Sequence, residues 1–162
     1  MNGYQLTNLA MKSTQLRRTF VGVFARDSFA ELGCLVPGAY VINSSDRGST
    51  GHHWTCVFVP ECIADVTVFF DSLGAPPENY SISIPNPNPL LAAPTVLYNP
   101  QRFQAEGSGT CGLFCLYILH WLSIGVDFQQ LLKNFCYKTP LMNEKIILDF
   151  ERDLENGMMM NH

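Results

Sequence analysis

Four side chains in this sequence have the types and the order that thiol chemistry requires. Cys111 opens a long apolar segment and follows a glycine-rich string, Gly107-Ser108-Gly109-Thr110. An amide, Gln104, stands seven residues before it, and upstream lie His53 and, eighteen residues later, Asp71. A thiol nucleophile needs a base, the base needs an acid that orients it, and the developing oxyanion needs a hydrogen-bond donor. The set therefore predicts the chemistry of a cysteine protease.

Cys111 is the predicted nucleophile because its surroundings would favour the reactive thiolate. The first turn of a helix offers unpaired N–H groups and the positive end of the helix dipole, which lower the pKa of a thiol. The glycines around it let backbone and substrate approach closely, so Gly109 is a predicted substrate-binding residue. Cys115 lies one turn later inside the apolar run, where a cysteine packs like a small hydrophobic residue.

The histidine that would act as the base is not selected by the pattern alone. His52 and His53 stand together before a predicted strand, and strand alternation places them on opposite sides, so only one can face the thiol. Asp71 ends the next predicted strand. It could orient the imidazole, or it could simply begin the Asp-Ser-Leu-Gly turn that follows. Both interpretations stay open.

A glutamine is the predicted oxyanion donor. Gln104 would donate its side-chain N–H, helped by the backbone N–H of Cys111. Losing one such donor costs about 3 kcal/mol of transition-state stabilisation. Gln101 offers the same group three residues earlier, and a glutamine that merely faces solvent is the ordinary alternative.

Zinc is the other chemistry that histidines and cysteines suggest. His53, Cys56 and Cys62 lie close in sequence, with Cys34 earlier, but no Cys-x2-Cys pair exists and the spacings match no closed structural site. We therefore predict no metal. No phosphate loop, dinucleotide fingerprint or His-Glu-x-x-His motif occurs either.

Strands in the first part of the chain and helices in the second would position these residues. Alternation and β-branched residues predict strands at residues 20–24, 39–43, 54–59, 66–71, 80–84 and 95–98. Helices are predicted over residues 4–18, 111–123, 128–137 and 143–154, the last with Asn143 as its cap. The order predicts an α+β fold in one domain, residues 1–162, with residues 158–162 as a frayed tail.

The composition describes a globular, mildly acidic protein. Hydrophobic residues make up 47% and charged residues 15%, which excludes a disordered chain. Ten Lys and Arg against fourteen Asp and Glu give a net charge of −4, which argues against a general nucleic-acid binder. The acid-free, Arg-bearing first 26 residues are better interpreted as a basic helix than as a transit peptide.

The location expected from the sequence is inside the cell. No secretory signal is visible, so the six cysteines are expected to be reduced thiols. Residues 107–126 carry no charge, but their dense apolar part, from Cys111 to Val126, is 16 residues, short of the roughly 20 that span a bilayer. We predict a buried core helix there and no membrane contact.

Three stretches give the chain a family resemblance. They are Gly51-His52-His53-Trp54, Phe69-Phe70-Asp71-Ser72-Leu73-Gly74, and Gln104 through Cys115. The order His, acid, Gln, Cys differs from the papain order and resembles that of the adenovirus-type endopeptidases (adenain) and, more distantly, the SUMO-specific proteases of the same clan. In adenain a Gln likewise stands seven residues before a Cys-Gly-Leu-Phe-Cys string. The resemblance covers residues 20–123.

The resemblance implies a role for each matching residue. It selects His53 as base, beside Cys111 as nucleophile, Asp71 as orienting acid and Gln104 as oxyanion donor, and it makes Trp54 a wall of the active site. It implies a mixed β-sheet flanked by helices, with the nucleophile at the N-terminus of the central buried helix. The family cleaves viral precursor proteins at Gly-containing sites, since its narrow groove admits only small residues.

The resemblance also implies a setting for the reaction. A monomer acting on a polyprotein during virion maturation would work in the host nucleus or cytoplasm and in the virion. Adenovirus enzymes have Glu in place of Asp71, are basic, bind DNA, and form a disulfide with an activating peptide through a cysteine upstream of the Gln. This chain is acidic and has no cysteine between Cys62 and Gln104. We therefore expect no activation by DNA, and an activating peptide only without that disulfide.

Three hypotheses follow from the sequence. The first is a maturation endopeptidase of the adenain type. The second is an isopeptidase that removes SUMO or ubiquitin, because the SUMO branch threads a Gly-Gly tail. The third is a non-catalytic binding module on the same fold, in which Cys111 would have an ordinary pKa.

Overall fold

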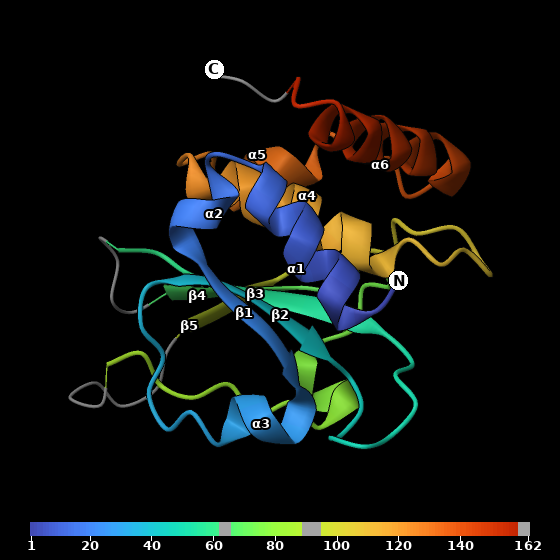
Figure 1. Cartoon of the computed structure of the whole chain (residues 1–162). Coiled ribbons are helices and arrows are strands. Elements are labelled where there is room, and N and C mark those ends of the chain that lie inside the picture. Colours follow the sequence, from blue (N-terminus) through green and yellow to red (C-terminus); the bar gives the residue numbers. More distant parts are fainter. Residues whose placement is uncertain (62–65, 89–94, 159–162) are drawn as a thin grey trace.

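The computed structural model describes residues 1–61, 66–88 and 95–158 (Figure 1). Its strands are β1 (Phe20–Ala25), β2 (Gly38–Asn43), β3 (Trp54–Val59), β4 (Val66–Phe70) and β5 (Thr95–Tyr98). Its helices are α1 (Gly3–Lys12), α2 (Leu16–Thr19), α3 (Arg26–Ala30), α4 (Cys111–Ser123), α5 (Phe128–Leu132) and α6 (Pro140–Glu155), with a 3-10 turn, η1 (Pro77–Tyr80). The predicted α+β class, a mixed sheet flanked by helices, is confirmed.

The five strands form one sheet in the order β1-β2-β3-β4-β5. The central pairs β2–β3 and β3–β4 are antiparallel, and the outer pairs β1–β2 and β4–β5 are parallel. Register aligns Val41 with Cys56 and Cys56 with Phe70, so this row of side chains shares one face of the sheet. The next row, Tyr40 with Val57 and Val57 with Phe69, points to the other face.

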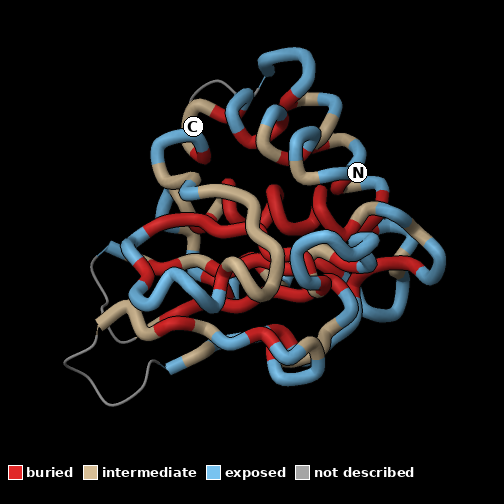
Figure 2. Tube along the Cα trace, turned by 60° about the horizontal axis from the view of Figure 1, so that its bottom comes forward, coloured by how far each residue is buried: buried red, intermediate tan, exposed pale blue. Residues whose placement is uncertain are grey.

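Each face of the sheet has its own core. On one face lie α1, α2, α4, α5 and α6, and on the other lie α3 and η1 (Figure 1). The row of Val41, Cys56 and Phe70 belongs to the larger core, whereas Tyr40 and Phe69 belong to the smaller one, with Phe29 of α3. Burial is densest through the sheet and the elements beside it (Figure 2). Antiparallel strands buried on both faces read as nearly continuous apolar runs, which is why β2 lacks visible alternation.

Helix α4 is the predicted buried helix, and Cys111 is its first residue, as predicted. Every residue from Cys111 to His120 is buried, since α4 packs on β3 below and against α1 and α6 around it. Within the described ranges, no helix has both the length and the apolar character needed to cross a membrane. The cysteines at 34, 56, 111, 115 and 136 are free thiols, and Cys62 lies outside the described residues.

The predicted helix over residues 4–18 is wrong as a single element. Ser13 is extended, with φ −77° and ψ 119°, and this ends α1. Its hydroxyl accepts the N–H of Leu16 at 2.9 Å, at the start of a separate helix, α2. The predicted strand at residues 80–84 is also wrong. Residues 77–80 form η1, and Ser81 turns the chain with φ 54°, so no ladder can continue there.

The C-terminal helices differ from the prediction at their ends. Helix α5 stops at Leu132 instead of residue 137, and α6 begins at Pro140, which suits the first turn of a helix because proline needs no donor there. Asn143 is therefore not the cap. Its side chain instead accepts the N–H of Cys136 and donates to the carbonyl groups of Phe103 and Cys136. Residues 159–162 of the predicted frayed tail lie outside the described residues.

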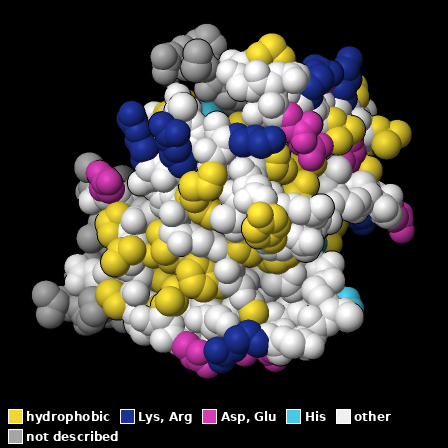
Figure 3. Space-filling model, in the orientation of Figure 1, with side chains coloured by type: hydrophobic (Ala, Val, Ile, Leu, Met, Phe, Trp, Pro, Cys, Tyr) yellow, Lys and Arg dark blue, Asp and Glu magenta, His cyan; other side chains and the backbone are white. Residues whose placement is uncertain are grey.

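Charged side chains lie at two ends of the molecule. On the face seen in Figure 3, Lys and Arg side chains lie mainly over the helical layer and are separated by uncharged and acidic side chains. At the opposite end, Arg26 pairs with Asp46 at 2.7 Å, and Arg47 pairs with Asp27 at 2.9 Å. These ion pairs fasten the loop after β2 to α3.

Candidate active site

Two strand ends and one helix start bring the predicted site residues together. His53 immediately precedes β3, and Asp71 immediately follows β4. Because β3 and β4 are antiparallel, the start of one lies beside the end of the other. Cys111 begins α4, which packs across β3. A separation of 58 residues between His53 and Cys111 in sequence is thereby closed in space.

The imidazole of His53 lies between the carboxylate and the thiol. Its Nε2 is 2.5 Å from Oδ1 of Asp71, and the ring lies close enough to Cys111 for each group to shift the pKa of the other. The His53 side chain is 10% exposed and that of Asp71 is fully buried. An imidazole that is held by a buried carboxylate and neighbours a thiol can hold and return a proton.

The Asp71 carboxylate serves both interpretations that the sequence left open. Besides His53, its oxygens accept the backbone N–H groups of Leu73 at 3.0 Å and Ala75 at 2.9 Å, which is the expected turn. Gly74 in that turn has φ +79°, and a Cβ there would lie 2.5 Å from the carbonyl carbon of Gln101. The turn therefore fixes the carboxylate that faces the histidine.

Electrostatics favour a charged pair at the thiol and imidazole. Burial lowers the pKa of His53, but hydrogen bonding to Asp71 and to Cys111 outweighs it and raises that pKa to about 9. Burial raises the pKa of Cys111, yet His53 and the backbone N–H groups of Trp54 and Gly112 bring it below its ordinary value. For Asp71, burial also opposes ionisation, and His53 with the turn N–H groups lowers the pKa overall.

Tyr80 is a residue of the site that sequence reasoning missed. Its hydroxyl donates to Oδ2 of Asp71 at 2.9 Å, and its ring centroid lies 5.5 Å from that of His53. Burial, and then the neighbouring carboxylate, raise the pKa of Tyr80 far above its usual range, so it remains a donor. A tyrosine in a proline-flanked loop carries no sequence signal for this contact.

Gln104 is buried beside the site, but its amide is already occupied. Its Oε1 accepts the hydroxyl of Ser72 at 2.5 Å, and its Nε2 donates to the carbonyl oxygen of Ser108 at 2.7 Å and to the Ser108 hydroxyl at 3.1 Å. The rival, Gln101, is exposed. The oxyanion role of Gln104 stays a prediction, and it requires one N–H to leave Ser108 for the substrate oxygen.

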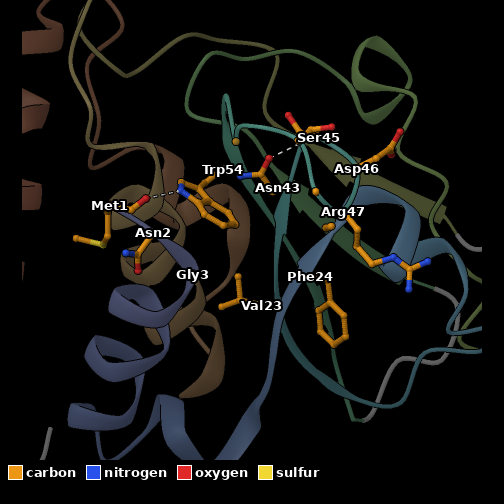
Figure 4. A pocket seen from close by; sticks show the side chains of 14 residues that line it. Met1, Asn2, Gly3, Val23, Phe24, Asn43, Ser45, Asp46, Arg47 and Trp54 are labelled. Carbon is orange, nitrogen blue, oxygen red and sulfur yellow. Dashed lines mark hydrogen bonds between the residues drawn. The ribbon is translucent and has the colours of Figure 1, made fainter.

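Trp54, whose backbone N–H interacts with Cys111, also lines a surface pocket of about 390 Å³. The pocket lies between the start of α1 and the ends of β1 and β2, and its wall includes Val23, Asn43 and Gly51 (Figure 4). The indole N–H of Trp54 donates to the carbonyl oxygen of Met1 at 3.0 Å, which sets the ring edge-on to α1. Trp54, which is predicted to form a wall of the active site, thus borders a pocket with room for a ligand.

Gly112 explains the close fit of α4 beneath Trp54. A Cβ at this position would lie 2.7 Å from Cδ2 of Leu6 and 3.3 Å from Cδ1 of Trp54. Gly109, the predicted substrate-binding glycine, is exposed and has no atom within 4 Å of such a Cβ, so it leaves open space before Cys111. Its binding role stays a prediction.

The remaining candidates lie elsewhere. His52 is exposed, and Cys115 is fully buried in the larger core. His120 is buried on α4, where Nδ1 contacts the hydroxyl of Ser13 at 2.9 Å and burial lowers its pKa to about 4. In the part of the chain that is described, no three His, Cys, Asp or Glu side chains gather closely enough to hold a metal ion.

Comparison with known proteins gives distant structural likeness and no match in sequence. No model of a known protein family matches the chain, and no curated protein matches it. Among solved structures, the chain is similar to the ASFV pS273R protease, with 19% sequence identity and a TM-score of 0.44. The match covers 63% of this chain and 42% of that protein, so the chain spans less than half of it.

Proposed function

We propose that the protein is a cysteine endopeptidase in which Cys111 is the nucleophile, His53 the acid and base, and Asp71 the orienting carboxylate. The observation that supports this best is the His53 ring, which contacts a buried carboxylate through Nε2 and neighbours a thiol whose pKa it lowers. Such a thiol and imidazole favour a thiolate–imidazolium pair near neutral pH.

The reaction proceeds in two stages on these groups. The Cys111 sulfur bonds to the scissile carbonyl carbon, and the carbonyl electron pair moves to oxygen. When the tetrahedral oxyanion collapses, the C–N bond breaks and the leaving amine takes the proton from His53. Water then attacks the thioester while His53 takes its proton, and the C–S bond breaks to release the acid and the thiol.

The oxyanion needs donors that face the carbonyl oxygen. The backbone N–H of Cys111 belongs to the first turn of α4, whose N–H groups have no partner inside the helix. Gln104 would add its second N–H once it leaves the Ser108 hydroxyl. The removal of one such donor typically costs about 100- to 1000-fold in kcat.

We propose precursor proteins of a virus or virus-like element as substrates, cleaved at Gly-containing sites. The quoted motifs support this through their resemblance to adenain, and the pocket beside Trp54 would hold substrate residues before the scissile bond. The reaction would take place in the host nucleus or cytoplasm and in the virion. An activating peptide would act without a disulfide to the segment before Gln104, because no cysteine lies between Cys62 and Gln104.

The test compares the wild type with Cys111→Ala on Gly-containing precursor peptides. Cleavage by the wild type and its loss in the variant are expected. Equal cleavage by both would overturn the proposal. A ubiquitin or SUMO probe ending in an electrophile after Gly-Gly distinguishes the isopeptidase: labelling of Cys111 without cleavage of any precursor peptide would replace the endopeptidase. Alkylation of Cys111 by iodoacetamide no faster than a free peptide thiol would indicate a binding module.

A further inference from the structure

A buried carboxylate on α6 holds the loop that leads to the nucleophile. Glu144 is 8% exposed, and its Oε1 accepts the backbone N–H of Ala105 at 2.9 Å and the hydroxyl of Ser108 at 2.8 Å. Its Oε2 accepts the hydroxyl of Thr110 at 2.6 Å. One side chain thus binds three points of the segment between Gln104 and Cys111.

The same loop controls the amide of Gln104. Ser108 is the acceptor of both Gln104 N–H contacts, through its carbonyl oxygen at 2.7 Å and its hydroxyl at 3.1 Å. Ser72 holds the other end of the amide by donating to its Oε1. The orientation of the amide therefore depends on where Ser108 lies, and Ser108 is placed by Glu144.

Burying the Glu144 carboxylate costs free energy unless its oxygen atoms accept hydrogen bonds. Among the described residues, Glu144 forms no ion pair with a Lys, Arg or His side chain. Taking a carboxylate out of water is unfavourable unless hydrogen bonds replace the lost hydration. All three donors come from one short loop, so the carboxylate and the loop hold each other.

We propose that Glu144 is a positioning residue for the oxyanion donor, and this rests on the proposed function. By accepting the Ser108 hydroxyl, Glu144 fixes Ser108 so that its carbonyl oxygen keeps one Gln104 N–H. The second N–H has only the longer contact, at 3.1 Å, and can exchange it for the substrate oxygen. Through Thr110, Glu144 also fixes the residue that precedes the Cys111 backbone N–H.

The test uses Glu144→Ala and Glu144→Gln, with Glu106→Gln as the matched control. Glu106 is an exposed acid in the same loop, so its change removes the same charge without touching the three donors. For Glu144→Ala we expect kcat on the cleaved peptide to fall about 100-fold, the size of loss that a misplacement of about 1 Å produces. KM should rise less than kcat falls, because the pocket beside Trp54 does not include this loop and only the predicted contact of Gly109 with substrate belongs to it.

Alkylation separates positioning from loss of structure. Iodoacetamide reacts with the thiolate without forming an oxyanion, so its rate with Cys111 should be unchanged in both Glu144 variants. The affinity of a peptide aldehyde, whose hemithioacetal does place an oxyanion there, should fall with kcat. Equal loss of alkylation and of kcat would overturn the proposal, as would a Glu144→Ala variant as active as Glu106→Gln.

A second variant and a second measurement cover the other outcomes. If Glu144→Ala does not fold, Ser108→Ala removes the hydroxyl that contacts Glu144, Gln104 and Thr110 and should lower kcat with unchanged alkylation, and full activity would overturn the proposal. If Cys111→Ala shows that the proposed function is wrong, hydrogen exchange still tests the placement. The amides of residues 105–110 should exchange faster in Glu144→Gln than in Glu106→Gln, and equal exchange would refute the role of Glu144.

Discussion

The substitution Asp71→Asn tests the electrostatic core of the proposed site. Asparagine has nearly the same shape, so the fully buried pocket around residue 71 stays filled. It removes the negative charge that lies 2.5 Å from Nε2 of His53. The change keeps the side-chain volume and acts mainly on the protonation of the imidazole, although the amide nitrogen of Asn cannot accept the backbone N–H that the replaced oxygen held.

The size of the effect follows from the shift at His53. Although burial alone lowers it, hydrogen bonding to Asp71 and to Cys111 raises the pKa of this residue from 6.5 to about 9, which corresponds to about 3 kcal/mol in favour of the charged ring. The hydrogen bond to Asp71 is the largest of the effects that raise this pKa, so loss of the carboxylate should lower the pKa, while the contribution of Cys111 remains. At pH 7.5, the protonated fraction of His53 is about 97% in the wild type and should be smaller in Asp71→Asn.

The assay is the pH dependence of kcat/KM on the cleaved peptide, measured together with the alkylation of Cys111. In the wild type, activity should fall on the basic side near pH 9, because His53 there loses the proton that the leaving amine needs. In Asp71→Asn this limb should move to lower pH, and a shift as far as pH 6.5 would bring about a tenfold loss at pH 7.5. Asp153→Asn, on α6 away from the site, serves as the control.

One result would refute the reasoning. If Asp71→Asn kept a basic limb near pH 9 and alkylated like the wild type, the carboxylate would not be the group that raises the pKa of His53. The thiolate–imidazolium pair would then need another cause, and the role proposed for Asp71 would be wrong.

Two further predictions concern stability. Gly74→Ala should lower the free energy of unfolding, measured in urea, by at least about 1–3 kcal/mol, because φ is +79° and the new Cβ would meet Gln101 at 2.5 Å. Gly33→Ala, with φ +71° and no neighbour within 4 Å, isolates the backbone part, and an equal loss in both would exclude the clash. His120 has a pKa of about 4 against 6.5 in the unfolded chain, so the unfolded state binds the extra proton between these values and stability falls as the pH falls from about 6.5 to 4. His120→Gln should show a flatter pH dependence of the unfolding free energy in this window, and an unchanged slope would contradict the assignment.

The elements carrying the site were predictable because each has a strong local pattern. The strand at residues 54–59, the strand that ends before Asp71 and the apolar helix from Cys111 occur as predicted. The contacts between these elements were harder to predict from the sequence. The choice between His52 and His53 depends on which strand face meets α4, and the resemblance rather than the pattern selected His53 before the structure placed it against Asp71.

The contacts that hold the site were not predictable, since they link distant and irregular segments. Tyr80 reaches Asp71 from a 3-10 turn. The sequence of this proline-rich region predicted a strand at residues 80–84 instead. Glu144 reaches Ser108 from a helix whose start was placed three residues too late. In both cases a single polar side chain, with no periodic pattern around it, makes the contact.

The topology has a consequence for the order in which the protein is made. His53 and Asp71, the proposed base and acid, flank β3 and β4 and are synthesised well before Cys111, which begins α4, whereas Glu144, which holds the loop before Cys111, comes later still on α6. A ribosome-bound or truncated chain that lacks α6 would present Cys111 with this loop unsupported. If the proposed function is right, activity should therefore appear only after α6 packs against the rest of the domain.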